Sequence, residues 1–210
     1  MILVTFALPF ESAGFRRTRA ARDVVVVHTG MGAGPARAAV AAAIAKHAPS
    51  LVLSSGFAGG LDPSLKTGDF LVEGGPASEF PPGTFITVED VLVMAEQKVT
   101  LRERTGASAV DMETDGIRAA CEEAGVRLVI ARAISDGATE DIGLPPELLR
   151  GLATRPLAAA PAVAWQLLTR AGPRRAFLRM IRGSRAAQRS LAESLPRLLS
   201  LLQKGDPVSG

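Results

Sequence analysis

The stretch Ala109-Val110-Asp111-Met112-Glu113-Thr114-Asp115-Gly116 decides the fold, together with Ala131-Arg132-Ala133-Ile134-Ser135-Asp136-Gly137-Ala138 further along the chain. In each stretch a short apolar run, typical of a buried strand, ends in acidic residues. An open α/β sheet presents charged groups in this way at the carboxyl ends of its strands, where ligands bind. We therefore predict that Asp111, Glu113 and Asp136 share one cleft. The alternative is that they are acids at helix N-termini, facing the helix dipole and the free amides, and for Asp111 both interpretations stay open.

Apolar, partly β-branched runs alternate with helical patterns along the rest of the chain. The runs that predict strands are residues 2–7, 24–28, 51–55, 70–72, 85–88 and 128–134. The helical patterns are residues 36–46, 94–104 and 114–124, of which 94–104 is charged and is expected to face solvent. This alternation predicts an α/β fold with a largely parallel sheet.

The composition limits the classes of protein to which the chain can belong. Its 210 residues, 47% hydrophobic and 21% charged, fit one globular domain, residues 1–210. A single cysteine, Cys121, and two histidines leave no internal disulfide and no metal-ligand spacing, which suits a reducing cytoplasm. With no Tyr and one Trp, the basic residues are not interleaved with aromatic ones, so we expect no nucleic-acid partner.

The C-terminal region, about 145–205, is predicted to be helical and rich in arginine. Between Arg170 and Arg197 it contains eight arginines and only one acidic residue, Glu193. A solvated basic face is the favoured interpretation. The alternative is a helix that lies on the surface of an anionic membrane, and it stays open.

Three further segments follow predicted strands and are polar or rich in glycine. Glu11 follows the first predicted strand, and from its local sequence alone it reads as an exposed loop acid. The turn Thr29-Gly30-Met31-Gly32-Ala33-Gly34 joins a strand to a helix start and could bind an anion or a hydroxyl group, but it is neither a Walker loop nor a dinucleotide fingerprint. The small residues within 56–61 allow main chain to lie against a planar ligand, or the segment forms a plain tight turn.

These motifs, in this order, resemble the nucleoside phosphorylase and nucleosidase superfamily, and within it the methylthioadenosine/S-adenosylhomocysteine nucleosidase branch. The matching pieces are Ala7 to Glu11, Thr29 to Gly32, Ser55 to Asp69, Ala109 to Glu113 and Ala131 to Asp136, which together span roughly residues 1–138. The resemblance implies a three-layer α/β/α sandwich with a central mixed, largely parallel sheet. The short middle of the chain and the arginine-rich tail resemble the hopanoid-associated phosphorylases in particular.

The resemblance implies an enzyme that cleaves the N-glycosidic bond of a purine nucleoside, with no cofactor and no metal. Asp136, oriented by Ser135, would be the general acid at purine N7. Glu113 would hold the ribose 2′ and 3′ hydroxyls, Met112 would pack against the sugar, and Glu11 would activate the attacking water. This pairing of acid and base suits a reaction with an oxocarbenium-like transition state.

The other residues expected to bind substrate come from the glycine-rich segments. Ala58 and Gly59 would meet the base with their main chain, and Gly30 and Gly32 would line the site. Phe57 stands where the family usually has Ser or Thr, so a hydroxyl near the nucleophile is missing.

Hydrolysis is expected rather than phosphorolysis, because no set of phosphate-binding arginines is evident beyond Arg16 and Arg17. Phosphate would be the co-substrate if the chain were a phosphorylase. A non-catalytic nucleoside-binding protein is the alternative from another class, and it has no need of a proton donor opposite a water activator.

The short segment between Gly60 and Glu113 and the Gly- and Pro-rich loop at residues 74–83 predict a site that is open at the ribose 5′ side. A bulky apolar 5′ group, as in adenosylhopane, is favoured over methylthioadenosine. We expect a homo-oligomer, a dimer or larger, in the cytoplasm. If the arginine-rich tail lies on a membrane surface, the protein would be peripheral to that membrane.

Overall fold

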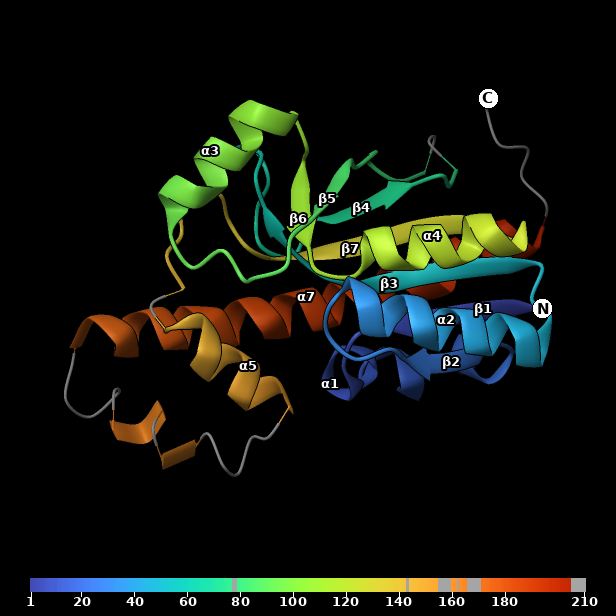
Figure 1. Cartoon of the computed structure of the whole chain (residues 1–210), viewed down its shortest axis with the longest axis horizontal. Coiled ribbons are helices and arrows are strands. Elements are labelled where there is room, and N and C mark those ends of the chain that lie inside the picture. Colours follow the sequence, from blue (N-terminus) through green and yellow to red (C-terminus); the bar gives the residue numbers. More distant parts are fainter. Residues whose placement is uncertain (77–78, 143, 155–159, 162, 166–170, 205–210) are drawn as a thin grey trace.

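The computed structural model of the chain describes residues 1–76, 79–142, 144–154, 160–161, 163–165 and 171–204 (Figure 1). Its centre is a sheet of seven strands. The strands are β1 (Ile2–Phe6), β2 (Val25–His28), β3 (Leu51–Gly60), β4 (Phe70–Glu73), β5 (Phe85–Thr87), β6 (Ala109–Asp111) and β7 (Arg127–Asp136). The helices are α1 (Pro9–Ser12), α2 (Ala33–His47), α3 (Ala95–Thr105), α4 (Thr114–Ala124), α5 (Pro146–Thr154) and α7 (Ala171–Gln203), with short 3₁₀ turns at Phe15–Arg17 and Arg19–Arg22.

The sheet is mixed and largely parallel, as predicted. Strand β1 pairs in parallel with β2 and β3, and β3 pairs in parallel with β7. Strand β4 runs antiparallel to β7, β6 runs antiparallel to the end of β3, and β5 is parallel to β6. The carboxyl ends of β1, β3 and β7 therefore meet at one edge of the sheet.

Strand β3 is longer than the sequence predicts. The prediction ended the strand at residue 55, but β3 continues through the glycine-rich segment to Gly60, so the tight-turn interpretation of residues 56–61 is wrong. Pairing with β7 along this whole length, with a register shift between Ala58 and Gly59, holds the segment extended. Tertiary pairing here overrides the low strand propensity of glycine.

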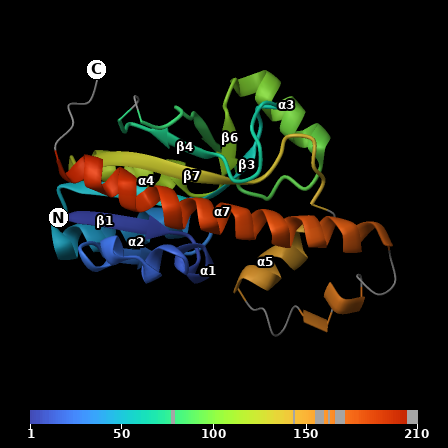
Figure 2. The ribbon, with the colours of Figure 1, turned by 180° about the vertical axis from the view of Figure 1, so that it is seen from behind.

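Helices cover both faces of the sheet, which confirms the three-layer sandwich. In Figure 1, α2 and α4 lie in front of the sheet, and Figure 2 shows α7 crossing its other face. The core under α2 and α4 includes Val40 and Ile117 packed with Leu3 and Val52. The core under α7 is built around buried leucines and phenylalanines that include Phe6, Phe15, Leu53, Leu191, Leu195 and Leu198.

The arginine-rich region forms the long helix α7, whose apolar stripe faces the sheet while most of its arginines are exposed. Arg170 and parts of the stretch before it lie outside the described residues. Within the described part of the chain, no helix combines the length and apolar character needed to cross a membrane.

Helix α7 packs closely against the end of β7 at Gly183. A Cβ atom at Gly183 would lie 2.0 Å from the carbonyl oxygen of Ser135. We expect Gly183→Ala to lower the free energy of unfolding by about 3 kcal/mol, because α7 must shift away from the sheet. Chemical denaturation measures this loss. The matched control is Gly34→Ala on α2, where a Cβ atom has no neighbour within 4 Å; equal stability of the two variants would contradict the close packing.

Candidate active site

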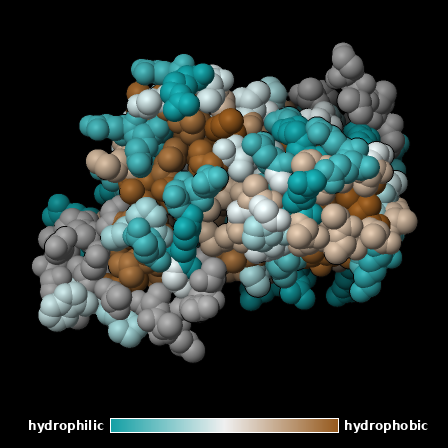
Figure 3. Space-filling view, viewed as in Figure 1, coloured by the Kyte–Doolittle hydropathy of each residue, from teal (hydrophilic) through white to brown (hydrophobic). Residues whose placement is uncertain are grey.

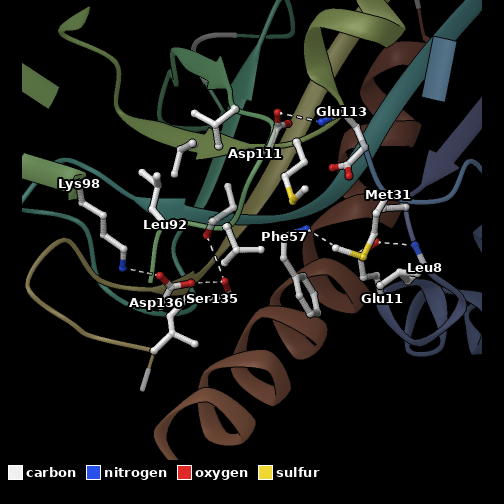
Figure 4. Close-up of a pocket in the computed structure, with 18 residues that line it drawn as sticks. Leu8, Glu11, Met31, Phe57, Leu92, Lys98, Asp111, Glu113, Ser135 and Asp136 are labelled. Carbon is white, nitrogen blue, oxygen red and sulfur yellow. Dashed lines mark hydrogen bonds and ion pairs between the residues drawn. The ribbon is translucent and has the colours of Figure 1, made fainter. Parts of the chain in front are cut away.

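A pocket of about 160 Å³ opens where the carboxyl ends of β1, β3, β6 and β7 converge. Its lining includes four acidic residues, Glu11, Asp111, Glu113 and Asp136, so the three acids that the sequence predicts to share one cleft do so (Figure 4). The other predicted site residues in the lining are Phe57, Ala58, Gly59, Met112 and Ser135. Gly30 and Gly32 are not among the described lining residues.

Glu11 is folded back into the pocket instead of lying in an exposed loop. Pro9 starts the short helix α1 directly after β1, and Glu11 is only 6% exposed. Its Oε2 accepts a hydrogen bond from the Leu8 backbone N at 2.9 Å, and its Oε1 accepts one from Phe57 N at 3.3 Å. Burial, which outweighs these hydrogen bonds, raises the pKa of Glu11 from 4.5 to about 7. A carboxylate with this pKa suits a general base at neutral pH.

The raised pKa of Glu11 has a measurable effect on stability. The protonated carboxyl is favoured in the folded chain, so its contribution is complete below pH 4.5 and is lost as the pH rises through about 7. We expect Glu11→Gln to be more stable than the wild type above pH 7, by up to about 3 kcal/mol, with the difference shrinking toward pH 4.5. Denaturation curves across this pH range measure it. Glu103→Gln, at an exposed position on α3, is the control; a difference independent of pH would contradict the burial of a titrating Glu11.

Glu113 stands at the start of α4 and is held by the glycine-rich turn. Gly32 N donates a hydrogen bond to Glu113 Oε1 at 2.9 Å, and Oε2 can accept from a ligand. The positive φ of Gly32, 95°, is a backbone conformation that favours glycine. Burial raises the pKa of Glu113, the Gly32 amide opposes the rise, and the charge of Asp111 adds to it. Gly32 therefore orients Glu113 instead of lining the pocket itself.

Asp111 fits the helix N-terminal interpretation better than a role in ligand binding. Its Oδ1 accepts hydrogen bonds from the backbone N of Glu113 at 3.3 Å and of Thr114 at 3.1 Å. Its Oδ2 lies 2.8 Å from Nε of Arg132, which is 2% exposed. Burial works against ionisation of Asp111, but Arg132 and the hydrogen bonds of Thr114 outweigh it and hold its pKa below the ordinary value.

Asp136 ends β7 at the opposite end of the pocket from Glu11 (Figure 4). Ser135 Oγ donates to Asp136 Oδ1 at 2.6 Å and also lies 3.3 Å from the carbonyl oxygen of Ala58. A Cβ atom at Gly59 would lie 3.3 Å from Asp136 Oδ2, so the missing side chain makes room for the carboxylate against β3. Lys98 Nζ donates to the same Oδ2 at 2.5 Å.

Lys98 is a pocket residue that the sequence does not reveal. The pattern of residues 94–104 predicts a surface-facing helix, which is wrong for Lys98, because this side chain is 1% exposed. One face of α3 lies over the edge of the sheet where the pocket opens. Lys98 extends from that face to Asp136. Nothing in the local sequence distinguishes Lys98 from its charged neighbours. For the buried Arg132 a signal exists, since it interrupts an apolar strand.

A smaller polar cavity lies behind the pocket and shares Glu11, Phe57 and Glu113 with it. Its lining also includes the hydroxyl residues Thr5, Thr29 and Ser55 and the side chain of Arg132. The buried hydroxyls of Thr5 and Ser55 have no hydrogen-bond partner among the described residues. Such groups favour a polar occupant that can donate and accept, such as a water molecule.

Charged side chains line both cavities. Among the described residues, no three His, Cys, Asp or Glu side chains are grouped as a metal site would require. The cationic residues that line the two cavities in the described part of the chain are Lys98 and Arg132, and each is paired with an aspartate. At one end of the pocket, the carboxylate of Asp136 is held by the Ser135 hydroxyl and the Lys98 ammonium. At the other end lies the buried carboxyl of Glu11, with a pKa of about 7.

Comparison with known proteins identifies the fold and the family. The chain is similar in structure to the 5′-methylthioadenosine nucleosidase of Arabidopsis thaliana (13% identity, 99% of this chain and 97% of that chain, TM-score 0.70). It is also similar to the futalosine hydrolase of Helicobacter pylori (16% identity, 94% and 97% covered, TM-score 0.62). The 5′-methylthioadenosine/S-adenosyl homocysteine nucleosidase of Campylobacter jejuni matches at 15% identity (94% and 99% covered, TM-score 0.61). At these identities the likeness establishes the fold. A sequence model of the phosphorylase superfamily matches residues 8–73 and 73–160, so the chain belongs to the phosphorylase superfamily.

Proposed function

We propose that the chain hydrolyses the N-glycosidic bond of a purine nucleoside of the adenosine type. The observation that carries this proposal is the position of Asp136 and Glu11 at opposite ends of one pocket, with Glu113 beside Glu11 (Figure 4). The similar solved structures include nucleosidases and a hydrolase, which supports the same class of reaction.

In the proposed reaction, the bond between purine N9 and ribose C1′ breaks while positive charge develops on the sugar. Asp136 delivers a proton to N7, so that the base leaves as a neutral molecule. Glu11 takes a proton from the water that attacks C1′, and its pKa of about 7 lets it act as a base near neutral pH. The polar cavity behind Glu11 supports the presence of this water, because it adjoins the pocket at Glu11.

Ribose recognition is assigned to Glu113 and Met112. The Gly32 amide holds one carboxylate oxygen of Glu113, and the other is available to accept from the 2′ and 3′ hydroxyls. Met112 lines the same wall and offers apolar contact to the sugar. Ala58 and Gly59 form the end of β3 beside Asp136, where their main chain can meet the base.

Hydrolysis is proposed in place of phosphorolysis because the charges that line the two cavities are unfavourable for a phosphate ion. The cations of the two cavities, Lys98 and Arg132, are paired with Asp136 and Asp111, and a phosphate ion near Glu11 would face carboxylates. Phe57 adds an apolar side chain to this side of the pocket. Phosphorolysis, with phosphate as co-substrate, and a purely nucleoside-binding role are the alternatives.

The substrate is proposed to carry a bulky apolar 5′ group, as adenosylhopane does. The pocket wall includes the apolar side chains of Val88, Val91, Leu92 and Ile142. Figure 3 shows hydrophobic side chains gathered on the same face, between α3 and α5. The described residues of the loop at 74–83 do not line the pocket, and Phe80 of this loop packs on Phe70 instead, with ring centres 5.3 Å apart.

An apolar groove adjoins the pocket on the other side. Phe10 is 48% exposed and contacts Phe57 with ring centres 5.6 Å apart. Phe10 also lines a groove with Met180 and Ile181 of α7. The exposed arginines of α7 support a peripheral contact with anionic lipid next to this groove. We also propose that the chain forms a homo-oligomer in the cytoplasm.

The test is incubation of the purified protein with adenosine, methylthioadenosine and an adenosine bearing a long apolar 5′ chain, each with and without phosphate. We expect free adenine and free ribose product without phosphate, and the highest kcat/KM for the apolar substrate. Release of a ribose 1-phosphate only when phosphate is present would assign phosphorolysis instead. Binding of the nucleosides with no release of base would leave the nucleoside-binding alternative.

A further inference from the structure

The ion pair between Lys98 and Asp136 bears on the source of the proton in the proposed reaction. Lys98 extends from α3 and is 1% exposed, although lysine is rarely buried without a partner. Its Nζ lies 2.5 Å from Asp136 Oδ2. A buried charge at this position, in contact with the residue proposed as the general acid, calls for a functional explanation.

The hydrogen bonds of Lys98 indicate its protonation state. Nζ donates to Asp136 Oδ2 at 2.5 Å, to the carbonyl oxygen of Gly137 at 2.8 Å and to that of Glu140 at 3.1 Å. Three acceptors match the three N–H bonds of an ammonium group, whereas a neutral amine has only two. Lys98 is therefore charged, and Asp136 opposite it is a carboxylate.

A carboxylate has no proton to give to purine N7. Two donors direct a proton at this carboxylate, the Ser135 hydroxyl at Oδ1 and the Lys98 ammonium at Oδ2, and the ammonium is the stronger acid. Oδ2 is also the carboxylate oxygen that lies closer to a Cβ atom built at Gly59, a residue that lines the pocket. We propose that Lys98 acts through Asp136 as the proton reservoir of the site. This inference rests on the proposed function.

Each bond that breaks in the transfer is matched by a bond that forms. As the bond between N9 and C1′ breaks, its electron pair moves into the purine and makes N7 more basic. An Nζ–H bond of Lys98 breaks, the proton passes to the Asp136 carboxylate, and from this carboxyl it passes to N7, where a new N–H bond forms. Lys98 ends as a neutral amine, Asp136 ends as it began, and Glu11 holds the proton of the attacking water. Exchange with solvent returns Lys98 and Glu11 to their starting states.

The other charged groups around Lys98 do not replace Asp136 as its partner. Asp141, in the loop after β7, accepts a hydrogen bond from Ala95 N at 2.8 Å. Arg102 on α3 pairs with Asp62 at 2.6 Å, and Arg179 of α7 donates to the carbonyl oxygen of Asp141. Glu140 contacts Lys98 through its main-chain oxygen. Asp136 is thus the carboxylate that Lys98 meets in the described part of the chain.

The experiment compares the pH profiles of kcat for the wild type, Lys98→Met and Lys98→Arg, from about pH 5 to about pH 9, on whichever adenosine-type nucleoside the wild type cleaves. At about pH 8 we expect kcat of Lys98→Met to fall ~10²-fold, because the relay has lost its proton source. Toward the acidic end the difference should shrink, because solvent can then protonate the unpaired Asp136. KM should change little. Arg104→Met, at an exposed position on the same helix, is the control and should match the wild type.

Lys98→Arg separates proton supply from positioning. Arginine keeps the positive charge and the donors toward Asp136, but its guanidinium group does not give up a proton in proteins. We expect this variant to be slow at every pH, without recovery at the acidic end of the range. Thermal melting of each variant checks that the fold is intact.

Three outcomes would overturn the proposal. They are wild-type kcat in Lys98→Arg, an unchanged kcat in Lys98→Met, and a loss in Lys98→Met that is equal at every pH, which is what a merely structural role predicts. In all three the wild type still releases base, so the proposed function stands. No release of base by the wild type would contradict the proposed function and this inference together.

Discussion

The Asp136→Asn variant is expected to release purine base at least ~10²-fold more slowly than the wild type. The amide keeps the shape of the side chain and can still accept from Ser135, which donates to Oδ1 at 2.6 Å. It cannot take up a proton from Lys98 and pass it to N7. Turnover should therefore fail while the base still fits between Gly59 and the end of β7.

Steady-state release of adenine measures the loss, and calorimetric titration with free adenine measures binding. Adenine affinity should stay close to that of the wild type. The matched control is Asp115→Asn, an exposed acid on α4, which should leave kcat unchanged. Near-normal turnover by Asp136→Asn would remove Asp136 from the mechanism, and melting of the variant distinguishes lost chemistry from lost folding.

The acidic ends of the strands could be predicted from the sequence because they depend on local pattern. An apolar run that ends in Asp or Glu, as at Glu113 and Asp136, follows from strand burial. The edge at which parallel strands meet explains the position of Asp136 on β7, whereas β6, which leads to Glu113, runs antiparallel to β3. The fold class follows from the same alternation of strands and helices. These features need no knowledge of which segments are neighbours in space.

The contacts that orient these acids could not be predicted, since they depend on how distant segments pack. The Gly32 amide reaches Glu113 because α2 and α4 cross closely, and a Cβ atom at Gly116 would lie 1.9 Å from the carbonyl oxygen of Ala33. Lys98 reaches Asp136 only because α3 folds over the sheet edge. Glu11 reads as an exposed acid until Phe57 of β3 is placed beside it.

Arg132 shows how a buried charge in an apolar strand serves the site indirectly. Arg132 lies in β7 and its side chain is 2% exposed. It donates hydrogen bonds to Ser54 O at 2.9 Å, Ser54 Oγ at 3.1 Å and Thr114 Oγ1 at 2.9 Å. It also forms an ion pair with Asp111. These bonds tie the centre of the sheet to the start of α4, next to Glu113. Its loss should therefore affect stability first and catalysis second.

We expect Arg132→Met to lower the free energy of unfolding by about 3–5 kcal/mol at neutral pH, because Asp111 is left as a buried charge without its partner. In the wild type Arg132 helps to hold the pKa of Asp111 below its ordinary value of 3.8. That contribution to stability is present above about pH 4 and is lost as the pH falls further. Urea denaturation at neutral pH and at about pH 4 measures the loss, which should be smaller in acid, where the unpaired carboxyl of Asp111 can take up a proton.

The double variant Arg132→Met with Asp111→Asn tests the cause of this loss. Removing the second charge leaves a neutral pair, and the new amide side chain can still accept from the backbone N of Thr114, which lies 3.1 Å from Oδ1 of Asp111 in the wild type. We expect the double variant to recover a large part of the stability lost by Arg132→Met, which is the coupling expected of residues in one ion pair. Additive losses, with the double variant less stable than either single variant, would mean that Arg132 stabilises the fold through Ser54 and Thr114 and not through the charge of Asp111.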